Sequence, residues 1–259
     1  MDKEIKKIVL IVEYDGTNYF GFQLQARHDN QPTIQSELEK AIFKLTGERL
    51  RILAASRTDA GVHAKGQVVS FRTKSNIELK NFVSGLNHYL PEDIAVLSAY
   101  KVNDKFNVRS DAQSREYSYY ILNRSVRSAI WGRYAYLVTV KLDVDAMDKA
   151  AGLLIGKHDF ASFTGNPGNL KTTVREVMRS KVEIKGDLLV FSMTANSFLP
   201  HQIRNTMGAL IQVGMKKMTV DKFYEIIEAR KPGLAGPRVP ANGLFLMRVN
   251  YSRSFGEMS

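Results

Sequence analysis

The predicted secondary-structure elements occur in the same order twice along the chain. In the first half, two amphipathic helices (33–46 and 79–90) separate four strands, at 6–15, 51–58, 66–73 and 94–102. The second half has strands at 115–123, 173–185, 188–196 and 243–250, helices from 147 to about 156, at 200–213 and at 221–230, and a strand-like insertion at 134–141. Each half therefore reads strand, helix, hairpin, helix, strand. This repetition constrains the fold more than any other feature.

Two such βαββαβ halves predict a pseudo-symmetric α+β protein in which two split-βαβ units pack together. We expect a mostly antiparallel sheet with its helices on one face and an active cleft between the halves. The polar segment at 104–114 is the expected junction. The N-terminal half then spans 1–104 and the C-terminal half spans 105–259.

Charge and composition narrow the class of function. The chain has 37 basic and 26 acidic residues and a net charge of +11, which favours a polyanionic partner such as a nucleic acid. Cysteine is absent, which excludes disulfides and thiolate metal sites and favours a cytoplasmic protein. The histidines show no metal-ligand spacing, so we expect no metal site built on them, and carboxylate ligands remain the alternative. No apolar run approaches the 18 or so residues of a membrane span.

The segment ILAASRTDAGVHAKGQVVSF (52–71) contains the first candidate catalytic residue, Asp59. Asp and Gly suit a tight turn for backbone reasons alone, so a purely structural role is one interpretation. Arg57 lies on the same strand face, where it can hold an anion, and His63 follows the turn. In a basic chain, a carboxylate at a strand end is also suited to act as a nucleophile or general base toward a nucleic acid.

Three further segments contain candidate functional residues. Arg204 in FLPHQIRNTMG either pairs with a carboxylate or lies in solvent. Tyr117 in REYSYYI either packs in the core or stacks on a base. The loop YDGTNYFGFQLQ (14–25) is an ordinary turn or an RNA contact through Gln23 and Gln25. By contrast, there is no complete P-loop, no dinucleotide-binding glycine motif after a strand and no GxSxG elbow.

These segments together resemble the tRNA pseudouridine synthase A family. The resemblance rests on SRTDAGVHAKGQVVSF, YDGTNYFGFQLQ and REYSYYI, and on HDFASF (158–163), FLPHQIRNTMG and AGPRVPANGLFL (235–246). The matches occur in order and run from residue 14 to about 250, so they cover nearly the whole chain.

The resemblance implies specific roles. Asp59 corresponds to the catalytic aspartate, Tyr117 to the tyrosine that packs on the target base, and Arg204 to the arginine that pairs with the aspartate. Gly243 and Leu244 match the small-apolar motif of the last strand. It also implies a homodimer that acts without cofactor or metal on uridines 38 to 40 of the tRNA anticodon stem-loop. The net charge of +11 separately predicts that a basic surface of one subunit holds the tRNA elbow.

Some positions depart from the family pattern. Arg238-Val239 replaces the usual Thr-Ala, Phe22 and Leu24 stand where Trp and Arg are common, and Phe106–Arg109 reads FNVR rather than Phe-x-Ala-Arg. Arg109 still ends that segment and is expected to contact substrate. Because these loops contact RNA beyond the target base in the family, the departures leave the choice of RNA open, and the same chemistry on ribosomal RNA is one alternative. Two other functions remain as alternatives: a glycosidase with a second carboxylate, and a non-catalytic split-βαβ RNA-binding protein.

Overall fold

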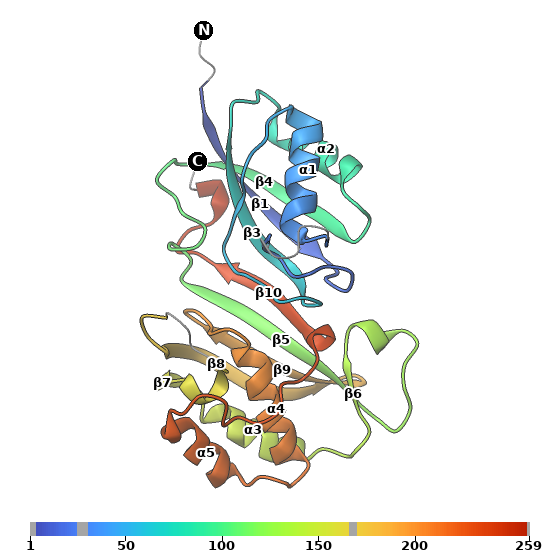
Figure 1. Cartoon of the computed structure of the whole chain (residues 1–259), viewed down its shortest axis with the longest axis vertical. Coiled ribbons are helices and arrows are strands. Elements are labelled where there is room, and N and C mark those ends of the chain that lie inside the picture. The colour runs from blue at the N-terminus through green and yellow to red at the C-terminus, as the bar shows by residue number, and fades with distance from the viewer. Residues whose placement is uncertain (1–3, 25–30, 166–169, 258–259) are drawn as a thin grey trace. The chain divides into compact units, whose positions relative to one another are not determined.

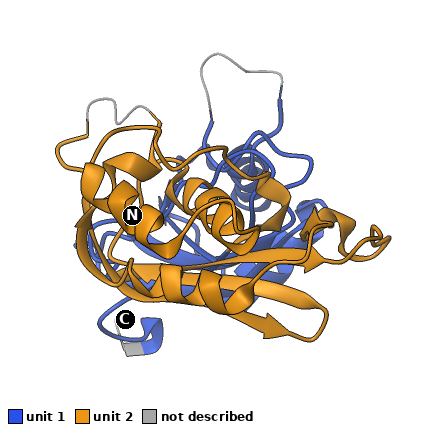
Figure 2. Cartoon of the chain, turned by 90° about the horizontal axis from the view of Figure 1, so that it is seen from below, with its two compact units in different colours: residues 1–113, 246–259 blue, residues 114–245 orange. Residues whose placement is uncertain are grey.

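The computed structural model describes residues 4–24, 31–165 and 170–257. The chain divides into two compact units: residues 1–113 with 246–259, and residues 114–245 (Figure 2). The expected division placed the junction earlier, at 104/105, and kept 246–259 with the second half. The end of the chain thus belongs with the first unit, because β10 (Leu244–Asn250) runs out of the second unit into it.

The first unit is an antiparallel sheet with two helices. Its middle strand β1 (Lys6–Tyr14) pairs with β3 (His63–Thr73) on one side and with β4 (Ile94–Val102) on the other. The short β2 (Leu53–Ala54) pairs antiparallel with β3. Helices α1 (Ile34–Thr46) and α2 (Leu79–Tyr89) cover one face of this sheet (Figure 1). Phe82 of α2 packs on Phe71 of β3, with ring centroids 6.1 Å apart, so the core lies between helices and sheet.

The second unit repeats this plan with additions. Strands β5 (Ser114–Asn123), β9 (Leu188–Ala195), β8 (Val174–Lys185) and β7 (Gly156–Asp159) form an antiparallel row, and β6 (Tyr136–Val138) adds to β5 in parallel. Its helices are α3 (Val144–Gly152), α4 (Gln202–Gly214) and α5 (Val220–Ala229). They lie on one face of the row (Figure 1). The β8–β9 hairpin turns at Gly186, whose φ of 58° suits glycine.

The predicted α+β class and the mostly antiparallel sheet are confirmed. The strand predicted at 51–58 is wrong, because only Leu53–Ala54 pair with β3 and the rest is irregular. At Ser56 the backbone pairs with a side chain in place of a neighbouring strand, because Ser56 N donates to Gln67 Oε1 at 3.3 Å. Strand β7 at 156–159 was not predicted, because its four residues, GKHD, include no large apolar side chain and so give no periodic signal. No helix in the described part of the chain is long and apolar enough to span a membrane.

Candidate active site

Asp59 begins a tight turn in the first unit. Val62 N donates to Asp59 O at 3.2 Å, and Gly61 at the third position has a φ of 76°, a conformation that glycine adopts without steric cost. The Asp59 side chain is partly exposed. The turn therefore presents a carboxylate at a position where solvent or a ligand can reach it.

The loop of residues 15–22 packs directly against the backbone of this turn. Phe22 N donates to Thr58 O at 3.0 Å, and Gly61 N donates to Tyr19 O at 3.3 Å. A Cβ on Gly16 would lie 2.0 Å from Val62 O, and one on Gly21, whose φ is +80°, would lie 2.7 Å from Thr58 O. Only glycine fits at these two positions, so the loop packs closely against the turn at both Thr58 and Val62.

Buried side chains of the sheet hold the strand end that leads into Asp59. Tyr14 Oη and Thr58 Oγ1 are 2.7 Å apart, and Gln67 Nε2 donates to Ser56 O at 2.8 Å. Gln67 is fully buried, and its amide also lies 3.4 Å from Tyr14 Oη. Buried hydrogen bonds of this kind restrict the backbone, because breaking one leaves an unsatisfied polar group at a cost of about 1–3 kcal/mol.

His63 ties the end of the turn to the start of the loop. Its ring is 1% exposed, and Nδ1 lies 3.1 Å from Gly16 N and 3.0 Å from Asp15 Oδ1. One nitrogen cannot accept and donate together, so the tautomer decides which contact is the hydrogen bond. In either case the contact is internal to the protein. The substrate contact predicted for His63 stays a prediction.

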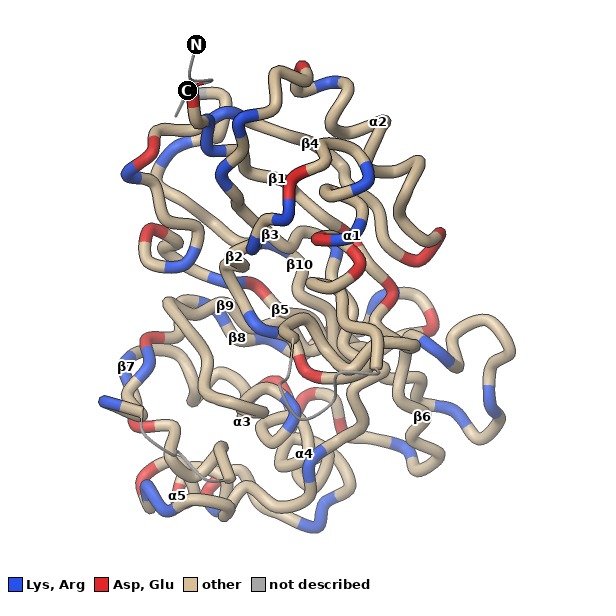
Figure 3. Tube along the Cα trace, turned by 45° about the horizontal axis from the view of Figure 1, so that its top comes forward, with Lys and Arg blue, Asp and Glu red and all other residues tan. Residues whose placement is uncertain are grey.

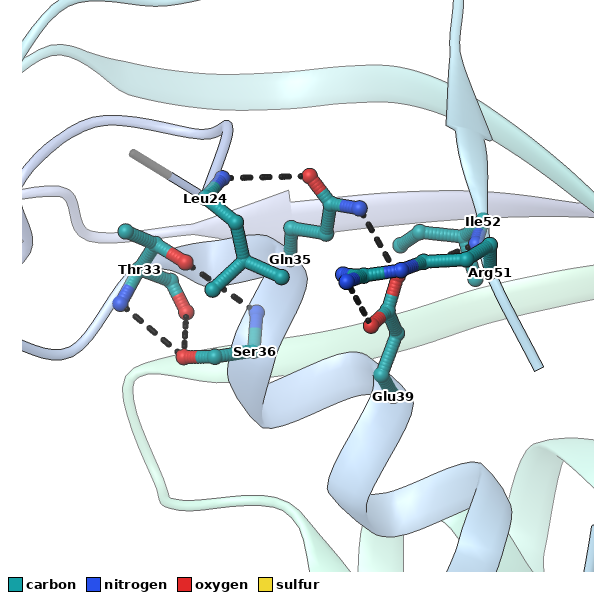
Figure 4. Close-up of polar contacts among 7 residues, drawn as sticks. All are labelled: Leu24, Thr33, Gln35, Ser36, Glu39, Arg51 and Ile52. Carbon is teal, nitrogen blue, oxygen red and sulfur yellow. Dashed lines mark hydrogen bonds and ion pairs between the residues drawn. The ribbon is translucent and has the colours of Figure 1, made fainter. Parts of the chain in front are cut away.

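The N-terminus of α1 connects the two segments that meet at the turn (Figure 4). Gln35 Oε1 accepts from Leu24 N at 3.1 Å, and Gln35 Nε2 donates to Glu39 Oε1 at 2.7 Å. Glu39 Oε1 also accepts from Ile52 N at 3.1 Å. The helix itself begins at a Thr33–Ser36 capping box. The end of the loop and the start of the segment leading to Asp59 thus share one anchor.

The remaining predicted residues of the first unit are exposed. Arg57, Gln23 and Arg109 all have accessible side chains. Arg109 lies in a turn in which its backbone N donates to Asn107 Oδ1 at 2.9 Å. Gln25 lies outside the described residues.

The second unit contains the other predicted site residues. Tyr117 on β5 is only 5% exposed, and its ring meets Phe198 edge-on at a centroid distance of 5.2 Å. Two residues along, Tyr119 is fully buried and donates to Pro240 O at 2.8 Å. Burial raises the pKa of Tyr119, and the nearby Arg204 guanidinium opposes that rise. Base contact by Tyr117 stays a prediction.

Arg204 has a fixed position on α4. Every residue of this helix is buried except Arg204 and Gln212. Arg204 Nε donates to Val239 O at 2.9 Å, and Val239 N lies 3.4 Å from Arg204 O. One turn further on, a Cβ on Gly208 would lie 2.0 Å from Pro237 O. The segment at 237–239 therefore lies against α4 and orients the guanidinium.

Sequence motifs that lie far apart in the chain meet around α4. Asn205 Nδ2 donates to Phe163 O at 2.8 Å, which joins FLPHQIRNTMG to HDFASF. Ala235 N donates to Ser162 O at 3.1 Å, which joins AGPRVPANGLFL to the same segment. Gly243, which precedes Leu244 at the start of β10, approaches β5 so closely that a Cβ would lie 2.7 Å from Tyr120 O. The small residue in the Gly243-Leu244 pair is thus required by packing.

Sequence reasoning missed the residues that support Asp59. Tyr14, Gly16, Gly21 and Gln67 position the turn, but each reads in sequence as an ordinary strand or loop residue. For the glycines, the sequence offers only their position among the aromatic residues of YDGTNYFGF, which an ordinary turn also shows. Among the residues that the structure describes, no group of three or more His, Asp or Glu side chains is placed to hold a metal ion.

Comparison with known proteins identifies the family. A family model described as tRNA pseudouridine synthase matches residues 10–111 and 150–252, which include Asp59 and Arg204 but not Tyr117. A relative from Acetivibrio thermocellus, named tRNA pseudouridine synthase A, is 39% identical over 247 residues, covering 95% of this chain and 100% of the relative. A protein of the same name from Syntrophomonas wolfei is 40% identical, covering 95% of this chain and 98% of its own length.

A solved structure titled as a Cbf5-Nop10-Gar1 complex aligns with 79% of this chain and 45% of its own, at 12% identity and a TM-score of 0.33, a likeness too distant to bear on the fold. The matches at close to 40% identity extend over nearly full length on both sides. The chain therefore belongs to the tRNA pseudouridine synthase family.

Proposed function

We propose that this enzyme converts uridine to pseudouridine at positions 38, 39 and 40 in the anticodon stem-loop of tRNA, with Asp59 as the catalytic carboxylate. Family membership supports the reaction class. The observation that carries the role of Asp59 is the packing of Gly16 and Gly21 against its turn. Two close backbone contacts hold a partly exposed carboxylate in one place, as a preorganised catalytic group requires.

The reaction is an isomerisation, so its atoms balance within the nucleotide. The bond from N1 of the base to C1′ of the ribose breaks, the base turns, and C5 bonds to C1′. The hydrogen leaves C5, and N1 gains a proton. Asp59 either removes the 2′ hydrogen of the ribose or attacks the sugar or base directly. In each case the target base must first leave its stack to be reached.

Arg204 and Tyr117 serve the same reaction in this proposal. A guanidinium paired with Asp59 keeps the carboxylate ionised, and the hydrogen bond from Arg204 Nε to Val239 O fixes the orientation of that guanidinium. Tyr117 supports the turned base through its ring and relays a proton through its hydroxyl. Arg57, Gln23, Arg109 and His63, with Gly243 and Leu244, contribute to substrate binding.

Two rival functions predict different residues. A glycosidase needs a second carboxylate next to the first, and the RTDAGVH segment offers Arg57 and His63 instead. A non-catalytic RNA-binding protein has no use for a rigidly held, partly exposed aspartate. The same chemistry on ribosomal RNA differs only in substrate. Mapping pseudouridines in tRNA and ribosomal RNA, with and without the gene, tests it: loss at positions 38–40 of tRNA supports the proposal, and loss confined to ribosomal RNA contradicts it.

The proposal extends to assembly and location. A net charge of +11 per chain exceeds what one turned base requires, and it suits a surface that holds folded RNA by its phosphates. We expect a cytoplasmic homodimer that holds the tRNA elbow as well as the stem-loop. Affinity for whole tRNA should then fall with salt more steeply than affinity for an isolated stem-loop. A monomer by sedimentation, together with equal slopes for both RNAs, contradicts this assembly.

A further inference from the structure

We infer that residues 124–134, here called the arginine–tryptophan loop, form a second RNA-contacting surface. In this inference Arg127 and Arg133 bind phosphates, and Trp131 stacks on an unpaired base. The loop connects β5 to β6 in the second unit. The inference rests on the proposed function, because it names a further contact with the same substrate.

The loop presents large apolar side chains to solvent. Ile130 is 78% exposed, Val126 is 65% exposed and Trp131 is 39% exposed. Single exposed apolar residues are ordinary on protein surfaces, but a group of three within six residues of one loop points to a binding surface. Tryptophan is also a preferred partner for stacked bases, because its ring offers the largest π face.

This exposure does not come from a loose loop. Arg124 Nε donates to Val126 O at 2.8 Å, and Nη2 donates to Arg127 O at 3.1 Å. Ser128 Oγ accepts from the backbone N of Ile130 at 3.2 Å and of Trp131 at 3.0 Å. The protein therefore uses one arginine and one serine to hold the apolar side chains outward, which lowers the entropy lost on binding.

The positive charge of the arginine–tryptophan loop favours RNA as its binding partner. The stretch from 117 to 142 contains no acidic residue and four basic ones, Arg124, Arg127, Arg133 and Lys141 (the loops flanking β6 in Figure 3). Within the described part of the chain, the side chains of Arg127, Arg133 and Lys141 make no hydrogen bond or ion pair. Unpaired cations beside an exposed aromatic ring are the pattern of proteins that bind unpaired nucleic acid. A second copy of the loop would bring like charge to a symmetric contact.

The C-terminal end of the loop is hydrogen-bonded to the residue next to the proposed substrate-binding pair Gly243-Leu244. Asn242 Nδ2 donates to Gly132 O at 3.2 Å and to Ala135 O at 3.1 Å. Asn242 directly precedes Gly243 and Leu244, which are proposed to contribute to substrate binding. Substrate RNA at that pair therefore has the loop as a neighbour in the same unit.

Trp131 makes a direct test possible, because it is the only tryptophan in the chain. Its fluorescence and its quenching by acrylamide report on this loop alone. We expect unmodified tRNA transcript at saturating concentration to protect Trp131 from acrylamide, and this protection should not depend on the protein concentration. A separate titration with an isolated anticodon stem-loop shows whether the contacted RNA lies in the stem-loop or elsewhere in the tRNA.

Variants test the charges against a matched control. Arg127→Gln/Arg133→Gln should lower the slope of log K against log salt by about 1.4–1.8, at about 0.7–0.9 for each lost phosphate contact. Lys157→Gln/Lys217→Gln removes the same charge from β7, at the edge of the β-row opposite β6, and from the segment after α4, and it should leave the slope unchanged. Trp131→Ala should weaken tRNA binding by about 5- to 150-fold, and Trp131→Phe by much less.

The outcomes separate this inference from the proposed function. If the wild-type enzyme forms pseudouridine but tRNA does not protect Trp131 from acrylamide, the role inferred for the loop is wrong and the proposed function stands. Absence of pseudouridine in every tRNA overturns the function. Protection that appears without RNA and is lost on dilution assigns the loop to contact between protein copies and overturns the inference. Equal salt slopes for the two double variants overturn it as well.

Discussion

Gly21→Ala should damage catalysis more than it damages the fold. The added Cβ would lie 2.7 Å from Thr58 O and 3.1 Å from Asp59 C, and both are backbone atoms that cannot rotate away. Ordinary contact begins at about 3.4 Å, so the loop and the Asp59 turn must separate by about 0.7 Å (3.4 minus 2.7). A misplacement of 1 Å costs about 10²-fold. We therefore expect kcat/KM to fall about 30- to 100-fold, or about 2–2.7 kcal/mol of barrier.

Gly47→Ala is the matched control. Gly47 ends α1 with a φ of 76°, close to the +80° of Gly21, but a Cβ there meets nothing within 4 Å. Both variants incur the left-handed backbone cost of about 1–2 kcal/mol, and Gly21→Ala adds about 1–3 kcal/mol of overpacking. In a chain of this size each kcal/mol lowers Tm by about 2–4 °C.

The assay is steady-state turnover on tRNA transcript, paired with urea unfolding of each variant. The reasoning predicts near-normal turnover for Gly47→Ala and a large loss for Gly21→Ala, measured where both are folded. If the two variants have equal turnover, the loop does not position Asp59, and the argument from its packing fails.

Four further predictions concern single side chains. Asp59→Asn keeps the turn but loses the reacting oxygen, so turnover should fall at least about 10⁴-fold, or about 5.4 kcal/mol, with tRNA affinity retained in filter binding. Arg204→Ala should lose most activity and Arg204→Lys should regain only part, because lysine lacks the planar fork; equal activity of wild type and Arg204→Ala removes this residue from the site. Tyr117→Phe should bind tRNA normally and turn over slowly, whereas full activity of both Tyr117→Phe and Tyr117→Ala would assign the ring to packing. Burial, and then the hydrogen bond to Asp93, raise the pKa of Tyr19. The protonated side chain therefore contributes stability that is fully present below a pH of about 10 and is lost as the pH rises further. In urea unfolding at alkaline pH, Tyr19→Phe should lose less of its free energy of unfolding than the wild type.

The order of helices and strands was predictable from sequence, because the hydrophobic periodicity of each element and the residues that end it indicate the same boundaries. Helix α1 shows this: Ile34, Leu38, Ala41 and Ile42 repeat at helical spacing, and Gly47 stops the helix with a positive φ. The segment at 51–58 was not predictable by the same rule. Its apolar residues suggested a full strand, but the backbone of Ser56 bonds to the Gln67 side chain, and no local pattern encodes a distant side-chain partner.

The candidate site divides in the same way. Asp59 stood out because a carboxylate in an otherwise basic, strand-flanked turn is chemically conspicuous. The roles of Gly16 and Gly21 were not visible, because a glycine required by close backbone approach looks in sequence like any glycine in a turn. Tyr14 and Gln67 likewise read as strand residues, and only the fold brings their polar groups to Thr58 and Ser56.

The most direct test of the central claim follows hydrogen at carbon 5 of uridine. The new bond to C1′ replaces the bond to that hydrogen, so tRNA labelled there with tritium releases it to water only when pseudouridine forms. Wild-type enzyme should release the label of the uridines at positions 38, 39 and 40, and Asp59→Asn enzyme, folded and bound to the same tRNA, should release none. Release by Asp59→Asn at the wild-type rate would contradict the account, because Asp59 would then be a residue of the turn and nothing more.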